Sequence, residues 1–96
     1  MKIKELFKSS KNWTKHYFAS DKNNKWIDEN SDKAVRFCLT GAIKKCYKKN
    51  QEGEKIYSKV LNYIKEKYGY VSVVSFNDDA RTKFKDIKKL VTELDI

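Results

Sequence analysis

Apolar residues recur at intervals of three and four positions along much of this chain, which is the spacing of one face of an α-helix. A short stretch of this kind runs from Met1 to Lys8. Three longer stretches predict helices over residues 31–49, 54–68 and 77–94. Each of these helices has one apolar face, and the faces can leave water by packing on one another. The pattern therefore predicts a core of three helices with a short N-terminal helix.

The ends of the long helices carry residues that favour a helix terminus. Ser31 or Asp32 is a good N-cap for the first and Asn77 or Asp78 for the third, because their side-chain oxygens accept a hydrogen bond from a free backbone N–H. Gly69 ends the second, since glycine readily takes the left-handed conformation found there. The apolar faces predict the core residues Val35, Cys38, Leu39, Ala42, Ile43, Cys46, Tyr57, Val60, Leu61, Ile64, Tyr68, Ala80, Phe84, Ile87, Leu90, Val91 and Leu94.

Three segments lack the helical spacing. Residues 13–19 and 25–28 are rich in aromatic side chains and flank an Asn-Asn turn, which predicts a small irregular hairpin. Residues 70–76 are rich in valine and partly alternate, which predicts a short strand or an extended linker. We therefore predict a mainly α fold, a single domain over residues 1–96, with a small β-hairpin or extended pair. Helices should hold about 60 % of the residues, well above the usual third.

Gly41 lies in the middle of the first long helix, where glycine costs about 1 kcal/mol relative to alanine. A glycine at such a position often allows another element to approach closely. We therefore predict that a neighbouring segment packs tightly against Gly41 and Ala42.

Charge is the main compositional clue to function. Of the 96 residues, 22 are Lys or Arg and 13 are Asp or Glu, which gives a formal net charge of +9. Such a surplus favours a polyanionic partner: nucleic acid, a nucleotide, an anionic membrane or an acidic protein face. The alternative is that an A/T-rich genome inflates lysine codons, since Arg36 and Arg81 are the only arginines.

The two cysteines, Cys38 and Cys46, are eight residues apart, which fits neither a metal pair nor a redox pair. On one helix they are separated by a rise of about 12 Å, too far for a disulfide, so we predict two small buried apolar groups. The first ten residues lack the apolar stretch of a signal peptide, and no run of about 18 apolar residues could span a membrane. We expect a cytoplasmic protein, in the host cell if a phage encodes it.

No recognisable catalytic set occurs in the sequence. His16 is the only histidine, and a lone histidine beside aromatic residues is more often structural than a general base. One histidine and two distant cysteines are too few ligands for a metal site, and no Walker loop, GxSxG or HExxH motif occurs. The neighbours Asp28-Glu29 and Asp78-Asp79 leave acid–base chemistry as a less favoured option. We favour a protein without enzymatic activity or cofactor.

Residues 76–82, Phe-Asn-Asp-Asp-Ala-Arg-Thr, place one of the two arginines at a predicted helix start. Free N–H groups and the helix dipole attract an anion there, and Arg81 and Thr82 would add a guanidinium and a hydroxyl. The alternative, which we favour, is structural: Asn77 or Asp78 caps the helix while Arg81 pairs with a carboxylate. Asp78 and Asp79 would also repel an anion.

The second candidate site is the basic end of the first long helix, with Lys44, Lys45, Tyr47, Lys48 and Lys49. Lysines contact phosphates without sequence specificity, and a tyrosine among them can stack on a base. The alternative, which is commoner, is a solvated helix end whose lysines offset the negative end of the helix dipole.

Several short motifs occur in the order found in a known family. They are Trp13, Ala19-Ser-Asp21, Ala34-Val-Arg-Phe-Cys38-Leu-Thr-Gly41-Ala42, Phe76-Asn-Asp78 and Arg81-Thr82. From about Trp13 to Leu94 the chain resembles an uncharacterised bacterial and phage domain family of unknown function, with Phe37 and Phe76 where that family has tryptophan. The resemblance implies one structural unit and a bacterial or phage source, and it implies no activity.

These motifs also suggest that Asp21, Asn77, Asp78 and Arg81 meet in one polar cluster. As structure, the cluster would hold the hairpin to the last helix. As function, it would be a ligand pocket with Thr82 added.

The leading functional hypothesis is a non-catalytic binding protein for an anionic ligand, a nucleotide or nucleic acid. The lysines of the basic end would contact phosphate, and the polar cluster would add ligand-binding groups. A second hypothesis is a protein–protein modulator, for instance a phage product that blocks a host or defence component, with an exposed aromatic patch from Trp26, Tyr47 or Tyr63. A third is a small enzyme, which requires the polar cluster to converge in a pocket.

Overall fold

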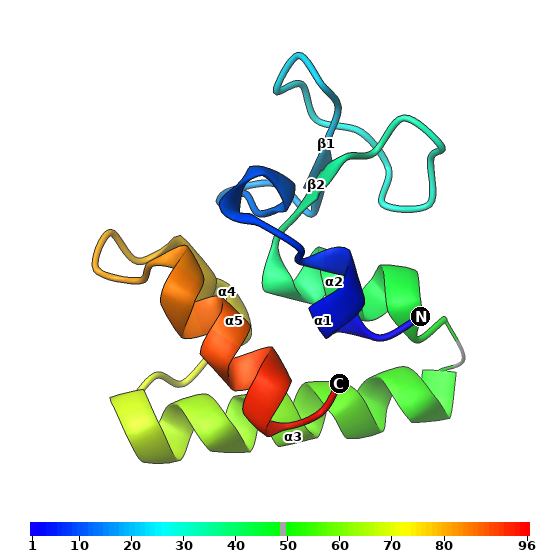
Figure 1. Ribbon diagram of the computed structural model, residues 1–96. Coiled ribbons are helices and arrows are strands. Elements are labelled where there is room, and N and C mark those ends of the chain that lie inside the picture. Colours follow the sequence, from blue (N-terminus) through cyan, green and yellow to red (C-terminus); the bar gives the residue numbers. More distant parts are fainter. Residues whose placement is uncertain (49) are drawn as a thin grey trace.

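The longest helix of the computed structural model, α3 (Asn50–Tyr68), lies along one side of the molecule (Figure 1). The structure describes residues 1–48 and 50–96. Helices α2 (Leu39–Cys46) and α4 (Val73–Asp78) pack against α3 and against each other. The short helix α1 (Ile3–Leu6) packs against α2 and against α5 (Phe84–Glu93).

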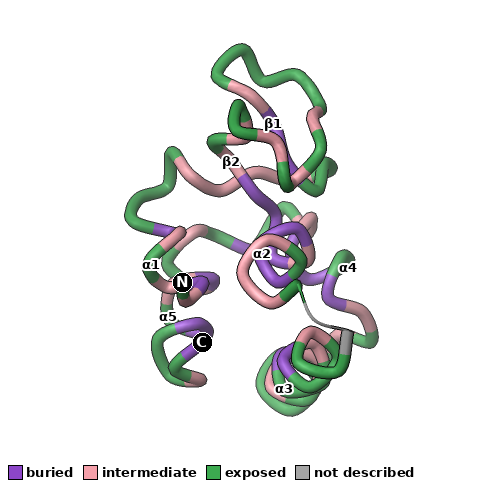
Figure 2. Tube along the Cα trace, turned by 90° about the vertical axis from the view of Figure 1, so that its right-hand side faces the viewer, coloured by how far each residue is buried: buried purple, intermediate pink, exposed green. Residues whose placement is uncertain are grey.

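One apolar core lies between these helices, because buried residues are concentrated on the sides that face one another (Figure 2). About half of the chain, 52 %, is helical, which confirms the predicted mainly α fold at slightly less helix than expected. The buried core residues are Ile3, Phe7, Ala19, Phe37, Leu39, Ala42, Ile43, Ile56, Val60, Ile64, Val73, Phe76, Ile87, Leu90, Val91 and Ile96.

The two ends of the chain lie side by side. The backbone N–H of Ile3 donates to the backbone oxygen of Ile96 at 2.5 Å, and both side chains are buried. Lys2 and Lys4 both reach Asp95 Oδ1, at 2.8 and 2.5 Å. The hydrogen bonds from these two lysines lower the pKa of Asp95 to about 2.

The small sheet has a different pairing from the predicted hairpin. Strand β1 (Ala19–Ser20) runs antiparallel to β2 (Arg36–Phe37), with Ala19 opposite Phe37 and Ser20 opposite Arg36. A tight turn does follow β1, since Ser20 also forms an isolated bridge with Trp26. The predicted small β-pair is therefore confirmed, but its second strand comes from later in the chain.

The predicted helix over residues 31–49 is wrong in its first third. Ser31 Oγ accepts the backbone N–H of Lys33 in a local turn, so it does not cap a helix. Pairing with β1 then draws residues 36–37 into a strand, and α2 starts only at Leu39 with Cys38 as its N-cap. Hydrogen bonds to a distant strand have outweighed the local helical pattern.

The prediction for residues 70–76 is also wrong, because Val73 begins helix α4. Ser72 is its N-cap and accepts the backbone N–H of Ser75 at 3.0 Å. Val73, Phe76 and Asn77 are spaced as one helical face and are buried. Asn77 and Asp78 therefore end α4 and do not cap the last helix.

The last helix, α5, is preceded by Lys83. The backbone N–H of Lys83 donates to Asp86 Oδ2 at 2.9 Å, as in a capping box. The helix is correspondingly shorter than the predicted 77–94, although its predicted core residues Ile87, Leu90 and Val91 are buried.

Close packing at Gly41 is confirmed. The backbone of Phe18, in the segment leading to β1, lies directly against it: a Cβ at residue 41 would be 1.9 Å from the Phe18 oxygen. Glycine is therefore needed at position 41, where the segment that leads to β1 meets α2.

We expect Gly41→Ala to destabilise the protein by about 3 kcal/mol, because a backbone segment must move to admit the methyl group. The gain in helix propensity offsets only about 1 kcal/mol of the strain. Unfolding in urea, followed by circular dichroism, measures this loss. Gly69→Ala is the matched control: Gly69 has φ +77° and open space around it, so conformational strain alone costs about 1 kcal/mol. An equal or smaller loss at position 41 would contradict the close approach.

Candidate functional site

Asn77 is at the centre of a buried polar cluster on α4 and is only 1 % exposed. Its Oδ1 accepts hydrogen bonds from Trp13 Nε1 at 2.7 Å and from the backbone N–H of Leu39 at 3.0 Å. Its Nδ2 donates to the Thr14 backbone oxygen at 3.1 Å and to Asp78 Oδ1 at 2.9 Å. One amide thus joins α4 to the N-terminal segment and to the first turn of α2.

Asp78 extends this cluster to His16. Its Oδ1 accepts the backbone N–H of His16 at 3.0 Å, and its Oδ2 lies 3.7 Å from His16 Nδ1. His16 has φ 73°, a left-handed conformation that is unusual for a residue with a side chain. The contact with Asp78 holds the chain in this conformation, which favours a structural role for both residues.

Arg81 pairs with Asp79, the residue that directly follows Asp78. Its Nε and Nη2 donate to the two carboxylate oxygens at 3.1 and 3.0 Å, and the Tyr70 hydroxyl adds a hydrogen bond of 2.7 Å. These contacts, the Arg81 guanidinium first, hold the pKa of Asp79 well below its usual range. Thr82 is 4 % exposed, and its backbone N–H donates to the backbone oxygen of Asp79 at 3.0 Å. The predicted pairing of Arg81 with a carboxylate is therefore found.

Asp21 lies apart from these residues, on the turn after β1. Its carboxylate accepts the backbone N–H groups of Asn23 and Lys25 at 2.8 and 3.0 Å, and the Lys25 N–H is the main cause of its lowered pKa. Arg36 Nη1 donates to its backbone oxygen at 2.7 Å. The structure therefore brings Asn77 and Asp78 together. Arg81 pairs with Asp79 instead, and the hydrogen bonds of Asp21 lie on its own turn.

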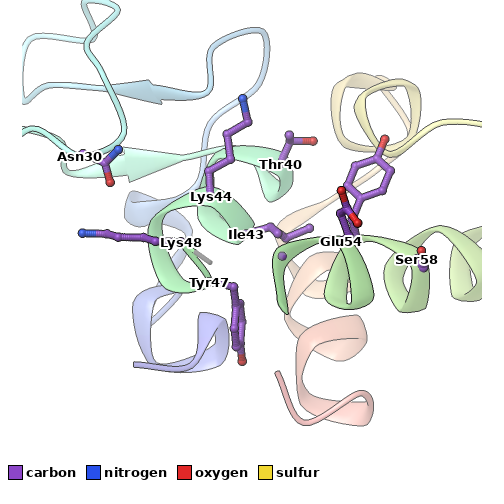
Figure 3. A pocket seen from close by; sticks show the side chains of 10 residues that line it. Asn30, Thr40, Ile43, Lys44, Tyr47, Lys48, Glu54 and Ser58 are labelled. Carbon is purple, nitrogen blue, oxygen red and sulfur yellow. The ribbon is translucent and has the colours of Figure 1, made fainter. Parts of the chain in front are cut away.

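The basic end of α2 lines an open groove of about 750 Å³ between α2 and α3 (Figure 3). Of the residues predicted there, Lys44, Tyr47 and Lys48 line the groove, and Lys45 does not. Lys49 lies outside the described residues. Because α2 ends at Cys46 and not at the predicted position 49, Tyr47 and Lys48 follow the helix. The α3 side of the groove consists of Gly53, Glu54, Tyr57 and Ser58.

Two lysines and one glutamate line this groove, which leaves a local charge of +1. The Lys44 ammonium lies 4.4 Å from the centre of the Phe18 ring, in cation–π contact, and the two ammonium groups point in different directions (Figure 3). The Tyr47 hydroxyl donates to the Ile96 backbone oxygen at 3.2 Å, and burial raises the pKa of Tyr47. Thr40 Oγ1, also on the groove, is buried without a hydrogen-bond partner in the described chain.

The α3 side of the groove was not predicted from the sequence. The pattern assigns Tyr57 to the core alone, whereas the structure shows it packed against the core and also on the groove. The spacing of Glu54, Tyr57 and Ser58 is that of one helical face next to the apolar one, a signal that could have marked a partly exposed wall.

The two cysteines are free thiols, Cys38 buried and Cys46 partly buried. Burial raises the pKa of both, which makes them poor nucleophiles. Cys38 Sγ accepts the backbone N–H of Gly41 at 3.2 Å and so caps α2. Across residues 1–48 and 50–96, no group of three or more His, Cys, Asp or Glu side chains could hold a metal ion. None of the described helices is both long and apolar enough to cross a membrane.

In a comparison with known protein families, a family model matches residues 3–94 of the chain. The chain belongs to DUF6197, a family of unknown function. This confirms the predicted membership of an uncharacterised family. No curated protein and no solved structure matches significantly. The part of the chain that matches DUF6197 includes the whole Asn77 cluster and the groove.

Several residues of the motifs that suggested this membership make structural contacts in the folded chain. Trp13 donates to Asn77, and Cys38 accepts from Gly41, which in turn faces Phe18. In this member of DUF6197 each of these residues therefore has a structural task.

We expect Asn77→Ala to destabilise the protein by about 2–4 kcal/mol, because the Leu39 N–H, the Trp13 Nε1–H and the Thr14 oxygen lose their partner. Urea unfolding measures the loss, with Asn23→Ala on the exposed turn as the control at less than about 0.5 kcal/mol. If Asn77→Ala behaved like the control, the amide would not hold these segments together.

Asp79 should make the stability of the folded protein depend on pH in the acidic range. Its folded-state pKa lies below the unfolded value of about 3.9, so its contribution is present above about pH 4 and is lost as the pH falls further. We expect wild type to be more stable than Asp79→Asn near neutral pH, and this difference to shrink below about pH 4. Urea unfolding of both proteins over this range measures it, and a constant difference would contradict the assignment.

Proposed function

We propose that this protein is a non-catalytic binding protein for an anionic ligand, a nucleotide or nucleic acid, held in the groove between α2 and α3. The observation that carries the proposal is that Lys44, Tyr47 and Lys48 line one groove with Tyr57 on its α3 side. Lysines and tyrosines that line the same groove suit a ligand that has both phosphates and flat bases.

Charge supports this choice of ligand. The groove has a surplus of one positive charge, and the whole chain has +9, so that an anion is attracted at long range and held locally. Glu54 and Ser58 supply acceptors for ribose hydroxyl groups. Because the two ammonium groups point in different directions, the groove suits an extended chain of phosphates better than one compact phosphate.

We propose no catalytic activity because the candidate polar residues are already hydrogen-bonded to other parts of the chain. The hydrogen-bonding groups of Asn77 are engaged with other parts of the chain, and Asp78 holds His16. Asp21 is engaged on its own turn. The convergence that a small enzyme would need is therefore not supported.

The double variant Lys44→Glu, Lys48→Glu tests the groove. We expect it to bind a labelled single-stranded oligonucleotide at least about tenfold more weakly than wild type, with a salt slope smaller by about 1.4, since each phosphate contact contributes about 0.7. Fluorescence anisotropy at two salt concentrations measures both quantities for DNA and for RNA.

The matched control is Lys11→Glu, Lys22→Glu, which changes the net charge equally at two exposed lysines away from the groove. An equal loss in control and groove variants would mean that only overall charge matters. If wild type shows no salt-dependent binding to nucleotides, DNA or RNA, the proposal is wrong.

A second candidate function is modulation of another protein, as a product of a phage or a bacterium. It is favoured by Trp26, which is 67 % exposed on the turn after β1. Large exposed aromatic side chains are common at the centres of protein interfaces. The two candidates use different surfaces: replacing Trp26 should affect only partner binding, and replacing the groove lysines only anion binding.

A further inference from the structure

A second hollow, of about 240 Å³, lies where the C-terminal end of α3 meets α4 and the segment that leads to α5. It is separate from the groove between α2 and α3, and the two share no lining residue. Its lining residues are Tyr68, Tyr70, Phe76, Arg81, Thr82 and Asp86. The volume suits one flat ring or one side chain.

Three aromatic rings form one side of this hollow. Tyr68 stacks on Phe76 with ring centres 5.1 Å apart, and Tyr70 meets Phe76 edge-on at 5.4 Å. Phe76 is buried, and the Tyr70 hydroxyl is fixed on Asp79. Tyr68 is partly exposed at the rim, so that an entering ring can stack there with little rearrangement.

The polar groups of the hollow differ in kind. The Asp86 carboxylate uses Oδ2 for the Lys83 backbone N–H, so Oδ1 is available as an acceptor. Arg81 has an 84 % exposed side chain and binds Asp79 through Nε and Nη2, which leaves Nη1 to donate. An acceptor on the wall and a cation at the rim complement a ligand with an amino group at one end and an anion at the other.

We propose that this hollow binds the base of a nucleotide, and that it selects bases with an exocyclic amino group: adenine, cytosine and guanine. The base stacks on Tyr68, its amino group donates to Asp86, and its phosphate lies against Arg81. Uracil and thymine present no such amino group to the carboxylate. A partner's lysine or arginine side chain fits less well, because Arg81 repels a second cation.

Titration with the four ribonucleoside 5′-monophosphates, followed by amide NMR shifts, tests the site. We expect AMP, CMP and GMP to shift residues 68–86 and to bind about tenfold more tightly than UMP. Tyr68→Ala should weaken binding about tenfold, whereas Tyr68→Phe should keep it. Asp86→Asn, which keeps an acceptor for the Lys83 N–H, should remove most of the preference over UMP.

Arg81→Ala separates the phosphate contact from the base contact. We expect this variant to bind AMP several-fold more weakly than wild type and to bind adenosine with unchanged affinity. Circular dichroism melting of each variant confirms that it is folded.

The proposal is overturned if all four nucleotides bind equally, or if Tyr68→Ala and Asp86→Asn leave binding unchanged. It is also overturned if residues 68–86 show no shifts, or if N-acetylarginine amide binds more tightly than AMP. Shifts at residues 43–58 instead would place nucleotides in the α2–α3 groove alone. The variant Lys44→Glu, Lys48→Glu changes the groove and leaves residues 68–86 intact. It therefore tests nucleotide binding in the groove separately from nucleotide binding in this hollow.

Discussion

The fold depends on one buried amide. Asn77 lies in the last turn of helix α4, and its four hydrogen bonds reach Trp13, Thr14, the start of α2 and Asp78. A buried donor or acceptor without a partner costs about 1–3 kcal/mol, so these segments must arrive together for the amide to be satisfied. Shape adds a second constraint at the same junction, because Gly41 admits the Phe18 backbone where a side chain would collide. The N-terminal segment with its small sheet and the helices thus form one unit.

Because of this arrangement, the polar residues that resemble a catalytic or ligand-binding set form hydrogen bonds within the fold. Asn77, Asp78 and Asp79 satisfy backbone or side-chain groups of other segments. The open surfaces of the described chain include the groove between α2 and α3 and the hollow beside Tyr68. Both combine aromatic rings with a basic side chain. This combination of rings and cations is the basis on which we propose nucleotide binding.

Local sequence and distant contacts disagree at two places, and the distant contacts determine the outcome at both. Residues 31–37 have the apolar spacing of a helix, but Arg36 and Phe37 pair with β1, and the Ser31 hydroxyl forms a turn. Residues 70–76 look extended because of their valines, but the Ser72 cap and the burial of Val73 and Phe76 make residues 73–78 a helix. In each case a few buried hydrogen bonds or apolar contacts exceed the small differences in intrinsic propensity.

The sequence alone determined the mainly α class, the long helix α3, the core face of α5, the tight packing at Gly41 and the membership of a family of unknown function. These follow from periodicity, glycine placement and motif order, which are local properties. Only the tertiary structure decided which strand pairs with β1, that Asn77 is enclosed between three segments, and that Tyr57 and Asp86 line open hollows. Those outcomes depend on which distant segments meet, and the spacing of residues along a chain contains no direct record of that.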